Sequence, residues 1–263
     1  MLTIKSINTV FNKGTADEHK ALSNLSLHVA EGEFVTVIGG NGAGKSSLFN
    51  AISGTLLCDS GSIELDKQDI TYMPEHRRAA LIGRIFQDPM KGTAPNLTVG
   101  ENLIIAYMRS VKKKIMSVPS KNERMFIKER LASLNLGLED RMSTKIGLLS
   151  GGQRQAVTLV MATLVKPKLL LLDEHTAALD PLSAKSVLEL TNKIVKENNI
   201  TTLMITHNIS SALSLGNRTI MMDSGSVALD IKNEERKELS VQDIIHRFSK
   251  IKNKELDDDN ILL

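Results

Sequence analysis

The sequence has few of the residues that build disulfide-linked or base-stacking proteins. Among 263 residues there is one Cys and no Trp, and aromatic residues make up 3%. A single cysteine permits no internal disulfide, which favours a reducing compartment. So few rings leave little from which to build a stacking platform for single-stranded nucleic acid. A net charge of +3 also falls short of a basic nucleic-acid footprint, so we expect no nucleic-acid partner.

Long apolar runs are missing as well. The longest apolar stretch, 156–165, is far shorter than the ~20 residues that a transmembrane helix needs. Residues 1–20 include Lys5, Lys13 and Asp17 where a signal peptide would have its apolar core. We therefore expect a chain that is neither exported nor inserted into a bilayer. Its 41% hydrophobic and 24% charged residues are typical of a chain with a substantial buried core.

Patterns of strands and helices alternate along most of the chain. Apolar and polar residues alternate over 2–7 and 22–29, which predicts an antiparallel pair of strands. Apolar runs without alternation are typical of strands buried on both faces of a parallel sheet. Such strands are expected at 33–38, 80–86, 169–172 and 201–206, and helices at 45–53 and 182–196. The predicted fold class is therefore α/β, with a mostly parallel sheet and an antiparallel β edge.

Residues 88–165 differ from the rest because helical periodicity dominates them and no convincing strand is present. We expect them to form a helical subdomain, inserted between two parts of an α/β core at 1–87 and 166–230. Basic residues gather at 112–114 and 121–130; a solvated helix face is favoured, and a membrane- or partner-facing surface is the alternative. A C-terminal amphipathic helix near 241–248 and a charged, frayed end are expected within 231–263.

A phosphate-binding loop is predicted at Gly39-x-x-x-x-Gly44-Lys45-Ser46. Glycines let backbone N–H groups approach phosphate oxygens, and the following helix presents its positive end. Lys45 would reach the β- and γ-phosphates, and the hydroxyl of Ser46 would hold Mg²⁺. A plain glycine-rich turn is the alternative, but the position between an apolar strand and a helix favours nucleotide binding. The predicted ATP contacts are Gly39, Gly40, Asn41, Gly42, Ala43, Gly44, Lys45, Ser46 and Ser47.

Two carboxylates, Asp173 and Glu174, follow the leucine run 169–172. Ligand sites of open α/β sheets assemble at the carboxyl ends of strands, which is where this pair is expected. Asp173 would lie beside Mg²⁺, and Glu174 would polarise the water that attacks the γ-phosphate. An acidic turn after a core strand would be the simpler explanation if the chain had no phosphate loop.

A second anion-binding helix start is predicted at Leu149-Ser150-Gly151-Gly152-Gln153. Kinases, GTPases and helicases share phosphate loops, but they do not combine one with this run some 105 residues later and an Asp-Glu strand end just beyond. In this combination the sequence resembles the ATP-binding subunits of ABC transporters, in which Leu-Ser-Gly-Gly-Gln is the signature motif. The resemblance extends over roughly residues 2–230.

The resemblance implies further roles for single residues. Phe11 takes the place of the aromatic residue that stacks on adenine, and His207 that of the histidine that holds the γ-phosphate. Gln87 matches the glutamine that links Mg²⁺ and the attacking water to the helical subdomain. Asp180 matches a loop that communicates across a dimer. The implied catalytic residues are Glu174, His207 and Gln87; the implied Mg²⁺ ligands are Ser46, Gln87 and Asp173; and the signature residues that act on the other subunit's ATP are Ser150, Gly151, Gly152 and Gln153.

Two positions depart from the family pattern. His175 stands where the family usually has Pro, so the local backbone is expected to be freer and a further donor to lie near the site. No second His has ligand spacing, which argues against a metal role for His175. Phe11 replaces the more usual Tyr, which retains the stacking face and loses a hydroxyl.

The resemblance implies a subunit that binds and hydrolyses MgATP and powers a separate membrane permease. Two copies would close head to tail, at the cytoplasmic face of the membrane. Segments such as Phe86-Gln87-Asp88-Pro89-Met90 and Asp173-Glu174-His175-Thr176 resemble a bacterial subgroup that pairs with a substrate-binding lipoprotein and imports aromatic amino acids such as tryptophan. The alternatives are the ATPase of an exporter and a soluble, non-transport ABC protein. Such soluble proteins generally have two nucleotide domains or a long coiled-coil insertion, whereas this chain has one phosphate loop, one signature and no heptad run.

Overall fold

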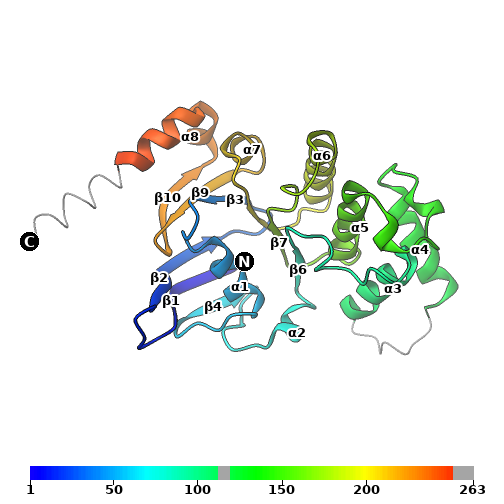
Figure 1. Cartoon of the computed structure of the whole chain (residues 1–263), viewed down its shortest axis with the longest axis horizontal. Coiled ribbons are helices and arrows are strands. Elements are labelled where there is room, and N and C mark those ends of the chain that lie inside the picture. Colours follow the sequence, from blue (N-terminus) through cyan, green and yellow to red (C-terminus); the bar gives the residue numbers. More distant parts are fainter. Residues whose placement is uncertain (112–118, 251–263) are drawn as a thin grey trace, which may run out of the picture. The chain divides into compact units, whose positions relative to one another are not determined.

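The computed structural model (Figure 1) describes residues 1–111 and 119–250. The chain separates into two compact units. Unit 1 comprises Met1–Ala51, Leu56–Thr71 and the described residues from Met204 onward. Unit 2 comprises Ile52–Thr55 and Tyr72–Leu203. Strand β8 (Thr202–Ile205) therefore begins in unit 2 and ends in unit 1. The division into core, helical subdomain and C-terminal segment that the sequence suggests stays a prediction.

Unit 1 contains a four-stranded antiparallel sheet in the order β2-β1-β4-β5. Its strands are β1 (Leu2–Phe11), β2 (His19–Val29), β4 (Ser60–Leu65) and β5 (Gln68–Asp69). The alternating residues Leu2, Ile4 and Ile7 of β1 are buried, as the period of two requires. The predicted antiparallel pair is confirmed, although β1 and β2 extend several residues further toward their connecting turn than alternation alone indicated.

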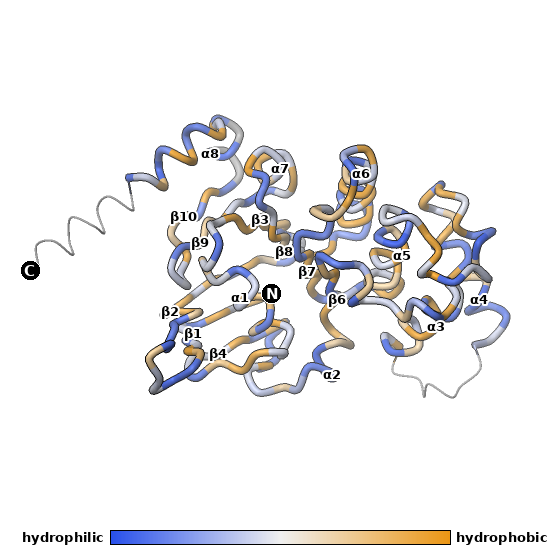
Figure 2. The backbone as a smooth tube through the Cα atoms, in the orientation of Figure 1, coloured by the Kyte–Doolittle hydropathy of each residue, from blue (hydrophilic) through white to orange (hydrophobic). Residues whose placement is uncertain are grey.

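The strand that leads to the phosphate loop is β3 (Phe34–Gly39), which pairs in parallel with β9 (Arg218–Asp223) in unit 1. Residues 34–38 are all buried, and the strand has the hydrophobic colour in Figure 2. Strand β9 also pairs, antiparallel, with β10 (Ser226–Lys232). Helices α7 (Ile209–Ser214) and α8 (Asn233–Glu238) and the helical residues 241–250 belong to the same unit. Ala212 of α7 and Ile244 of the helical residues 241–250 pack on the strands in one cluster with Ile38, Met221 and Ile231.

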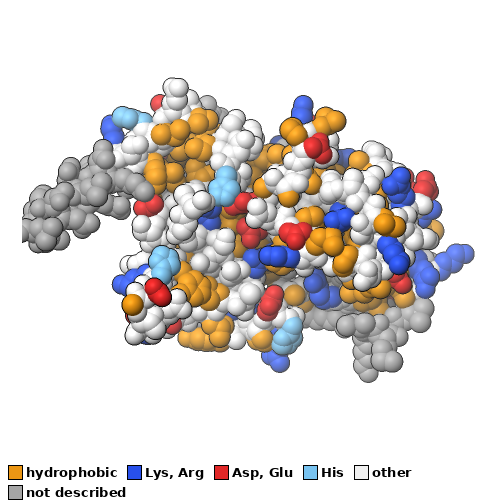
Figure 3. Space-filling model, in the orientation of Figure 1, with side chains coloured by type: hydrophobic (Ala, Val, Ile, Leu, Met, Phe, Trp, Pro, Cys, Tyr) orange, Lys and Arg blue, Asp and Glu red, His pale blue; other side chains and the backbone are white. Residues whose placement is uncertain are grey.

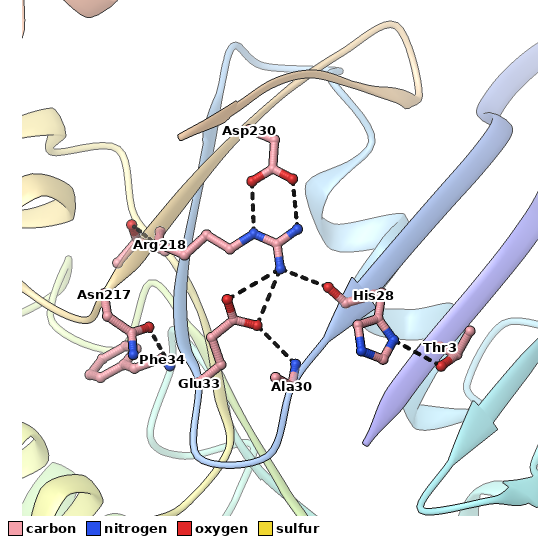
Figure 4. Close-up of polar contacts among 9 residues, drawn as sticks. Thr3, His28, Ala30, Glu33, Phe34, Asn217, Arg218 and Asp230 are labelled. Atoms are coloured by element: carbon pink, nitrogen blue, oxygen red, sulfur yellow. Dashed lines mark hydrogen bonds and ion pairs between the residues drawn. The ribbon is translucent and has the colours of Figure 1, made fainter. Parts of the chain in front are cut away.

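A polar network fixes the start of β3 (Figure 4). Arg218, the first residue of β9, makes a bidentate ion pair with Asp230 at 2.7 Å for each nitrogen–oxygen contact, and its Nη1 lies 3.2 Å from Glu33 Oε2. Glu33 Oε2 also accepts from the backbone N–H of Ala30 at 2.9 Å. Because the charged guanidinium bonds both carboxylates and Glu33 in turn accepts from Ala30, the network holds the turn before β3 in one conformation.

Helices dominate unit 2. They are α2 (Glu75–Arg78), α3 (Val99–Ser110), α4 (Lys121–Ala132), α5 (Gly151–Thr163) and α6 (Pro181–Glu197), with short 3₁₀ turns at Leu138–Asp140 and Ile146–Leu148. Helices α3, α4 and α5 share one apolar core, which includes the fully buried Leu103, Ile127 and Val157. Capping boxes start α3 at Thr98 and α4 at Ser120, because each hydroxyl accepts from the backbone three residues on and a Glu returns the bond.

The basic residues of the predicted patch that lie on α4 are exposed and alternate with acidic ones. Arg130 stacks over the ring of Phe126 at 5.3 Å, and Glu129 is its neighbour. Figure 3 shows Lys and Arg side chains scattered over the surface of this region rather than gathered in one field. This arrangement fits the solvated helix face. The remainder of the patch, Lys112 to Lys114, lies outside the described residues, as does the charged end at 252–260.

Unit 2 also contains two parallel strands, β6 (Ile82–Ile85) and β7 (Leu169–Asp173). The four leucines of β7 are fully buried, which confirms that the unbroken apolar run is a strand covered on both faces. The parallel register places Ile85 opposite Leu172, so both strands end at the same edge.

Among the helices of the described residues, none has the length and apolar character required to cross a membrane.

Candidate nucleotide-binding site

The phosphate loop of unit 1 connects β3 to α1 (Lys45–Ser53) as predicted. Gly39 has φ 149°, and a Cβ there would lie 2.4 Å from the carbonyl oxygen of Met222, so only glycine fits. Ala43 N–H donates to Gly40 O at 3.3 Å, and Gly225 N–H donates to Ala43 O at 3.2 Å. The loop is thus held against the β9–β10 turn of its own unit, and its following helix presents N–H groups at its start.

Lys45 is 6% exposed, and its ammonium group lies inside the curve of the loop. Nζ donates to Gly39 O at 2.9 Å and to Gly40 O at 2.8 Å. Two carbonyl partners keep this cation at the loop, where a phosphate oxygen would be recognised. The hydroxyl-bearing Ser46 is exposed and Ser47 is partly exposed in the next turn.

His207 lies at the same end of the strands as the loop. Thr206 N–H donates to Val37 O at 3.1 Å, and Val37 lies in β3 two residues before Gly39. His207 is the next residue after Thr206. The His207 side chain is exposed, and Asn208 caps α7 by accepting from Ser211 N–H at 2.9 Å. Unit 1 therefore places the predicted γ-phosphate contact and the phosphate loop at one sheet end.

Phe11 ends β1 with 40% of its surface exposed, which argues against a purely structural core role. His19 of β2 is its direct cross-strand partner. His19 and Lys20 line a hollow of about 420 Å³ together with residues 41–43 of the phosphate loop. No motif in the sequence marks His19 or Lys20; their place beside Phe11 follows from the pairing register of β1 with β2.

In unit 2, Asp173 and Glu174 occupy the carboxyl end of β7, as predicted. Glu174 has φ 45°, a left-handed conformation that is uncommon outside glycine and is concentrated at functional sites. Its carbonyl accepts from Ala177 N–H at 2.9 Å, which starts a tight turn. Gln87 lies two residues beyond the end of β6 and is exposed at the same edge. The structure thus brings Gln87, Asp173 and Glu174 to one edge of unit 2.

His175 follows this pair but points away from solvent. It is 2% exposed, and its Nε2 lies 3.1 Å from the hydroxyl of Thr191 on α6. Burial lowers the pKa of His175 from 6.5 to about 4, so the ring is neutral. The His175 ring was expected to place a further donor near the nucleotide site. Its Nε2 instead contacts Thr191 and so holds the loop after β7 to α6.

The predicted metal ligands are oxygen donors, namely the Ser46 hydroxyl, the Gln87 amide and the Asp173 carboxylate. The residues that the structure describes contain no cluster of three or more His, Cys, Asp or Glu able to hold a metal. A site with one carboxylate suits Mg²⁺, which keeps waters and phosphate oxygens as its other ligands. Arg84, which no sequence motif marks, lies beside Asp173, with Nη2 3.4 Å from Oδ2.

The signature run begins α5 with a capping box of its own. Ser150 Oγ accepts from Gln153 N–H, and Gln153 Oε1 accepts from Ser150 N–H, both at 3.3 Å. A Cβ on Gly152 would approach Ser183 Cβ to 2.9 Å, so glycine lets α5 pack against the start of α6. The signature is thus a helix N-terminus built against α6.

Asp180, the predicted dimer-loop residue, caps α6. Its Oδ1 accepts from Ser183 N–H at 3.0 Å. Hydrogen bonding to Ser183 lowers the pKa of Asp180, so the carboxylate stays charged at the surface. The cap fixes the loop between Glu174 and α6 at its far end.

A family model described as ABC transporter matches residues 22–177. The chain belongs to the ABC transporter family. It is 44% identical, over 250 residues, to a tyrosine transport ATP-binding protein of Clostridioides difficile, covering 94% of this chain and 98% of that protein. Longer relatives exist: the chain is 32% identical to the bicarbonate transport ATP-binding protein CmpC of Synechococcus elongatus, over 85% of this chain but 32% of CmpC.

Solved structures of ABC ATPases have the same fold. The ATP-binding cassette MJ0796, in a dimeric post-hydrolysis state bound to ADP and Pi, has a TM-score of 0.74 and 29% identity, and the match covers 88% of this chain and 98% of that one. The protein cbiO1 from Clostridium perfringens, part of the ABC transporter complex cbiONQ, has a TM-score of 0.77 and 27% identity, with 94% and 93% covered. The chain is accordingly the ATP-binding subunit of an ABC transporter and an ATPase of the α/β class.

Proposed function

We propose that this ABC subunit hydrolyses MgATP with the phosphate-loop residues of unit 1 and the strand-end residues of unit 2 described above. The observation that carries the proposal is the coexistence of a Lys45-centred phosphate loop in unit 1 with the left-handed Glu174 after Asp173 in unit 2. Lys45, Ser46 and Ser47 bind the phosphates, and Phe11 stacks on the base. When bound, Mg²⁺ supplies charge neutralisation at the phosphates, and Ser46, Gln87 and Asp173 hold it.

In the reaction, a water oxygen forms a bond to the γ-phosphorus while the bond from that phosphorus to the β–γ bridging oxygen breaks. Glu174 accepts the proton of the water, and ADP leaves with the bridging oxygen. His207 contacts the γ-phosphate and stabilises its charge. Gln87 orients the attacking water.

Two copies are proposed to act together, head to tail, with Ser150, Gly151, Gly152 and Gln153 of one subunit completing the phosphate site of the other. The surface near the signature supports this arrangement, because Leu148 and Leu182 are each 77% exposed beside α5 and at the start of α6. Large apolar side chains this exposed favour a covered surface. Asp180 would contact the partner from the same region.

A separate permease is proposed to bind a groove of about 360 Å³ in unit 2. Its lining includes Phe86, Ile105 and Arg109, and Ile105 is 43% exposed. An elongated apolar segment with acidic or amide groups would suit this mixture of apolar surface and a cation. Binding there would hold the chain at the cytoplasmic face of the membrane, peripherally.

The proposed cargo is an aromatic amino acid, taken up with the help of an extracytoplasmic substrate-binding protein. The supporting observation is 44% identity across nearly all of the tyrosine transport ATP-binding protein. The test is to purify the chain with the membrane proteins that it retains and to reconstitute them in vesicles. Uptake of tyrosine, phenylalanine or tryptophan that requires ATP on the side of this chain is expected; efflux, or no co-purifying permease, would contradict the proposal.

A further inference from the structure

Arg84 connects the proposed Mg²⁺ carboxylate with the groove proposed for the permease. The parallel pairing of β6 and β7 places Arg84 opposite Leu171, two residues before Asp173. Because side chains two residues apart point to the same face of a strand, the guanidinium reaches Asp173 along that face. Arg84 Nη2 lies 3.4 Å from Asp173 Oδ2, and the two side chains are 13% and 17% exposed.

Two other groups hold the guanidinium. Nη1 donates to Ser53 Oγ at 2.8 Å, and the centre of the guanidinium lies 4.7 Å from the ring centroid of Phe86. A cation stacked on a ring and hydrogen-bonded to a hydroxyl is fixed without the carboxylate. Arginine also stays charged at every accessible pH. Asp173 thus has a permanent positive charge beside one of its oxygens.

The groups that hold Arg84 face the groove. Ser53, Arg84 and Phe86 are all part of its lining, and Ile105 and Arg109 contribute another part. An occupant that packs on Phe86 or takes over the hydroxyl of Ser53 would change the position of the guanidinium. All of these residues belong to unit 2, so the connection lies within one compact unit.

We propose that Arg84 is a positioning residue that makes the availability of Asp173 depend on what occupies this groove. The inference rests on the proposed function, in which Asp173 holds Mg²⁺ and the permease enters the groove. Held as it is here, Arg84 opposes a divalent cation at Asp173 by like-charge repulsion and by satisfying Oδ2. A groove occupant that draws Arg84 away frees the carboxylate.

The first test uses the whole isolated chain and needs no turnover. A non-hydrolysable ATP analogue raises Tm in a Mg²⁺-dependent way, and the free Mg²⁺ concentration that gives half of this rise is measured in a metal buffer. Arg84→Met should lower that concentration about fivefold, the size expected for loss of one partly exposed charge pair. Arg84→Lys, which retains the charge, should stay near wild type.

Two further variants serve as a control and as an independent check of this test. Arg130→Met removes another arginine of unit 2 that stacks on a phenylalanine ring, 5.3 Å from the centroid of Phe126, and that does not belong to the groove lining; it should leave the Mg²⁺ dependence unchanged. Ser53→Ala removes one group that holds the guanidinium and should shift the Mg²⁺ dependence in the direction of Arg84→Met, which covers the case in which Arg84→Met does not fold. An unchanged or higher Mg²⁺ requirement in both Arg84→Met and Ser53→Ala would overturn the inference.

The second test adds the co-purified permease in nanodiscs. Permease binding should lower the half-saturating Mg²⁺ concentration of the wild-type chain and produce little further change in Arg84→Met. If the permease binds and stimulates hydrolysis but both proteins shift equally, the inference fails while the proposed function stands. If no permease binds the wild-type chain, the proposed function fails, and the Mg²⁺ result on the isolated chain still decides the role of Arg84.

Discussion

The buried imidazole of His175 should make the protein less stable as the pH falls below neutrality. Its ring is 2% exposed and its Nε2 lies 3.1 Å from Thr191 Oγ1. Desolvation is the cause that lowers the pKa of His175 from 6.5 to about 4. A group that binds a proton more weakly when folded than when unfolded couples folding to pH.

The sign and size of the effect follow from these two pKa values. Above pH 6.5 the ring is neutral in both states, and its contribution to stability is fully present. Between pH 6.5 and about 4 the unfolded chain gains a proton that the folded chain does not, so the free energy of unfolding decreases. At about 1.4 kcal/mol per pKa unit the total loss is about 3 kcal/mol, complete below pH 4.

The assay compares urea unfolding of the wild type and of His175→Asn from pH 7.5 to pH 4, without metal or nucleotide. The amide is neutral throughout, so the difference between the two free energies of unfolding isolates the imidazole from all other titrating groups. His28→Asn is the matched control, because His28 also bonds a threonine hydroxyl, Thr3 Oγ1, at 3.1 Å, but at the exposed surface. Parallel profiles for wild type and His175→Asn over this range would refute the reasoning.

Three further predictions concern the nucleotide site. Glu174→Gln should bind ATP with unchanged affinity and lose at least ~10²-fold in hydrolysis rate, because an amide cannot accept the proton of the attacking water; full activity in a phosphate-release assay would disprove this role. Lys45→Ala should weaken ATP binding itself, since the phosphates lose a held cation, and unchanged affinity by calorimetry would count against it. Phe11→Ala should cost ~1 to 3 kcal/mol of ATP affinity if the ring stacks on the base; an equal loss of thermal stability with no loss of affinity would show instead that Phe11 serves the core.

Helices and strands whose sequence signals lie within a few neighbouring residues could be predicted from the sequence. The helix after the phosphate loop runs from Lys45 to Ser53, the bounds that its glycines and periodicity indicate. Likewise β7 contains the whole leucine run 169–172, because four consecutive leucines indicate a strand that is buried on both faces. The strands β9 and β10 were not predicted: they form a hairpin across residues 224–225, and the parallel pairing of β9 with β3 depends on a partner far away in the chain.

Some residues of the site could likewise be found from sequence motifs, and others only from contacts in the folded chain. Motif residues such as Lys45 and Asp173 could be found from spacing, and the structure puts Lys45 at the start of α1 and Asp173 at the end of β7. Arg84 could not, because its contact with Asp173 spans 89 residues and depends on the register of β6 with β7. His175 was noticed as a departure, but only the packing of α6 shows that its ring is buried against Thr191.

The head-to-tail dimer is the central claim, and one experiment on purified heterodimers tests it most directly. Chains with two different tags are paired in two ways: Lys45→Ala with Ser150→Arg, and wild type with the double variant that carries both changes. If each ATP needs the loop of one subunit and the signature of the other, the first heterodimer retains one intact site and the second has none, by the symmetry of a two-fold assembly. The account predicts ATP hydrolysis by the first pair and none by the second. Hydrolysis by the second pair and none by the first would mean that loop and signature act within one chain, and would contradict it.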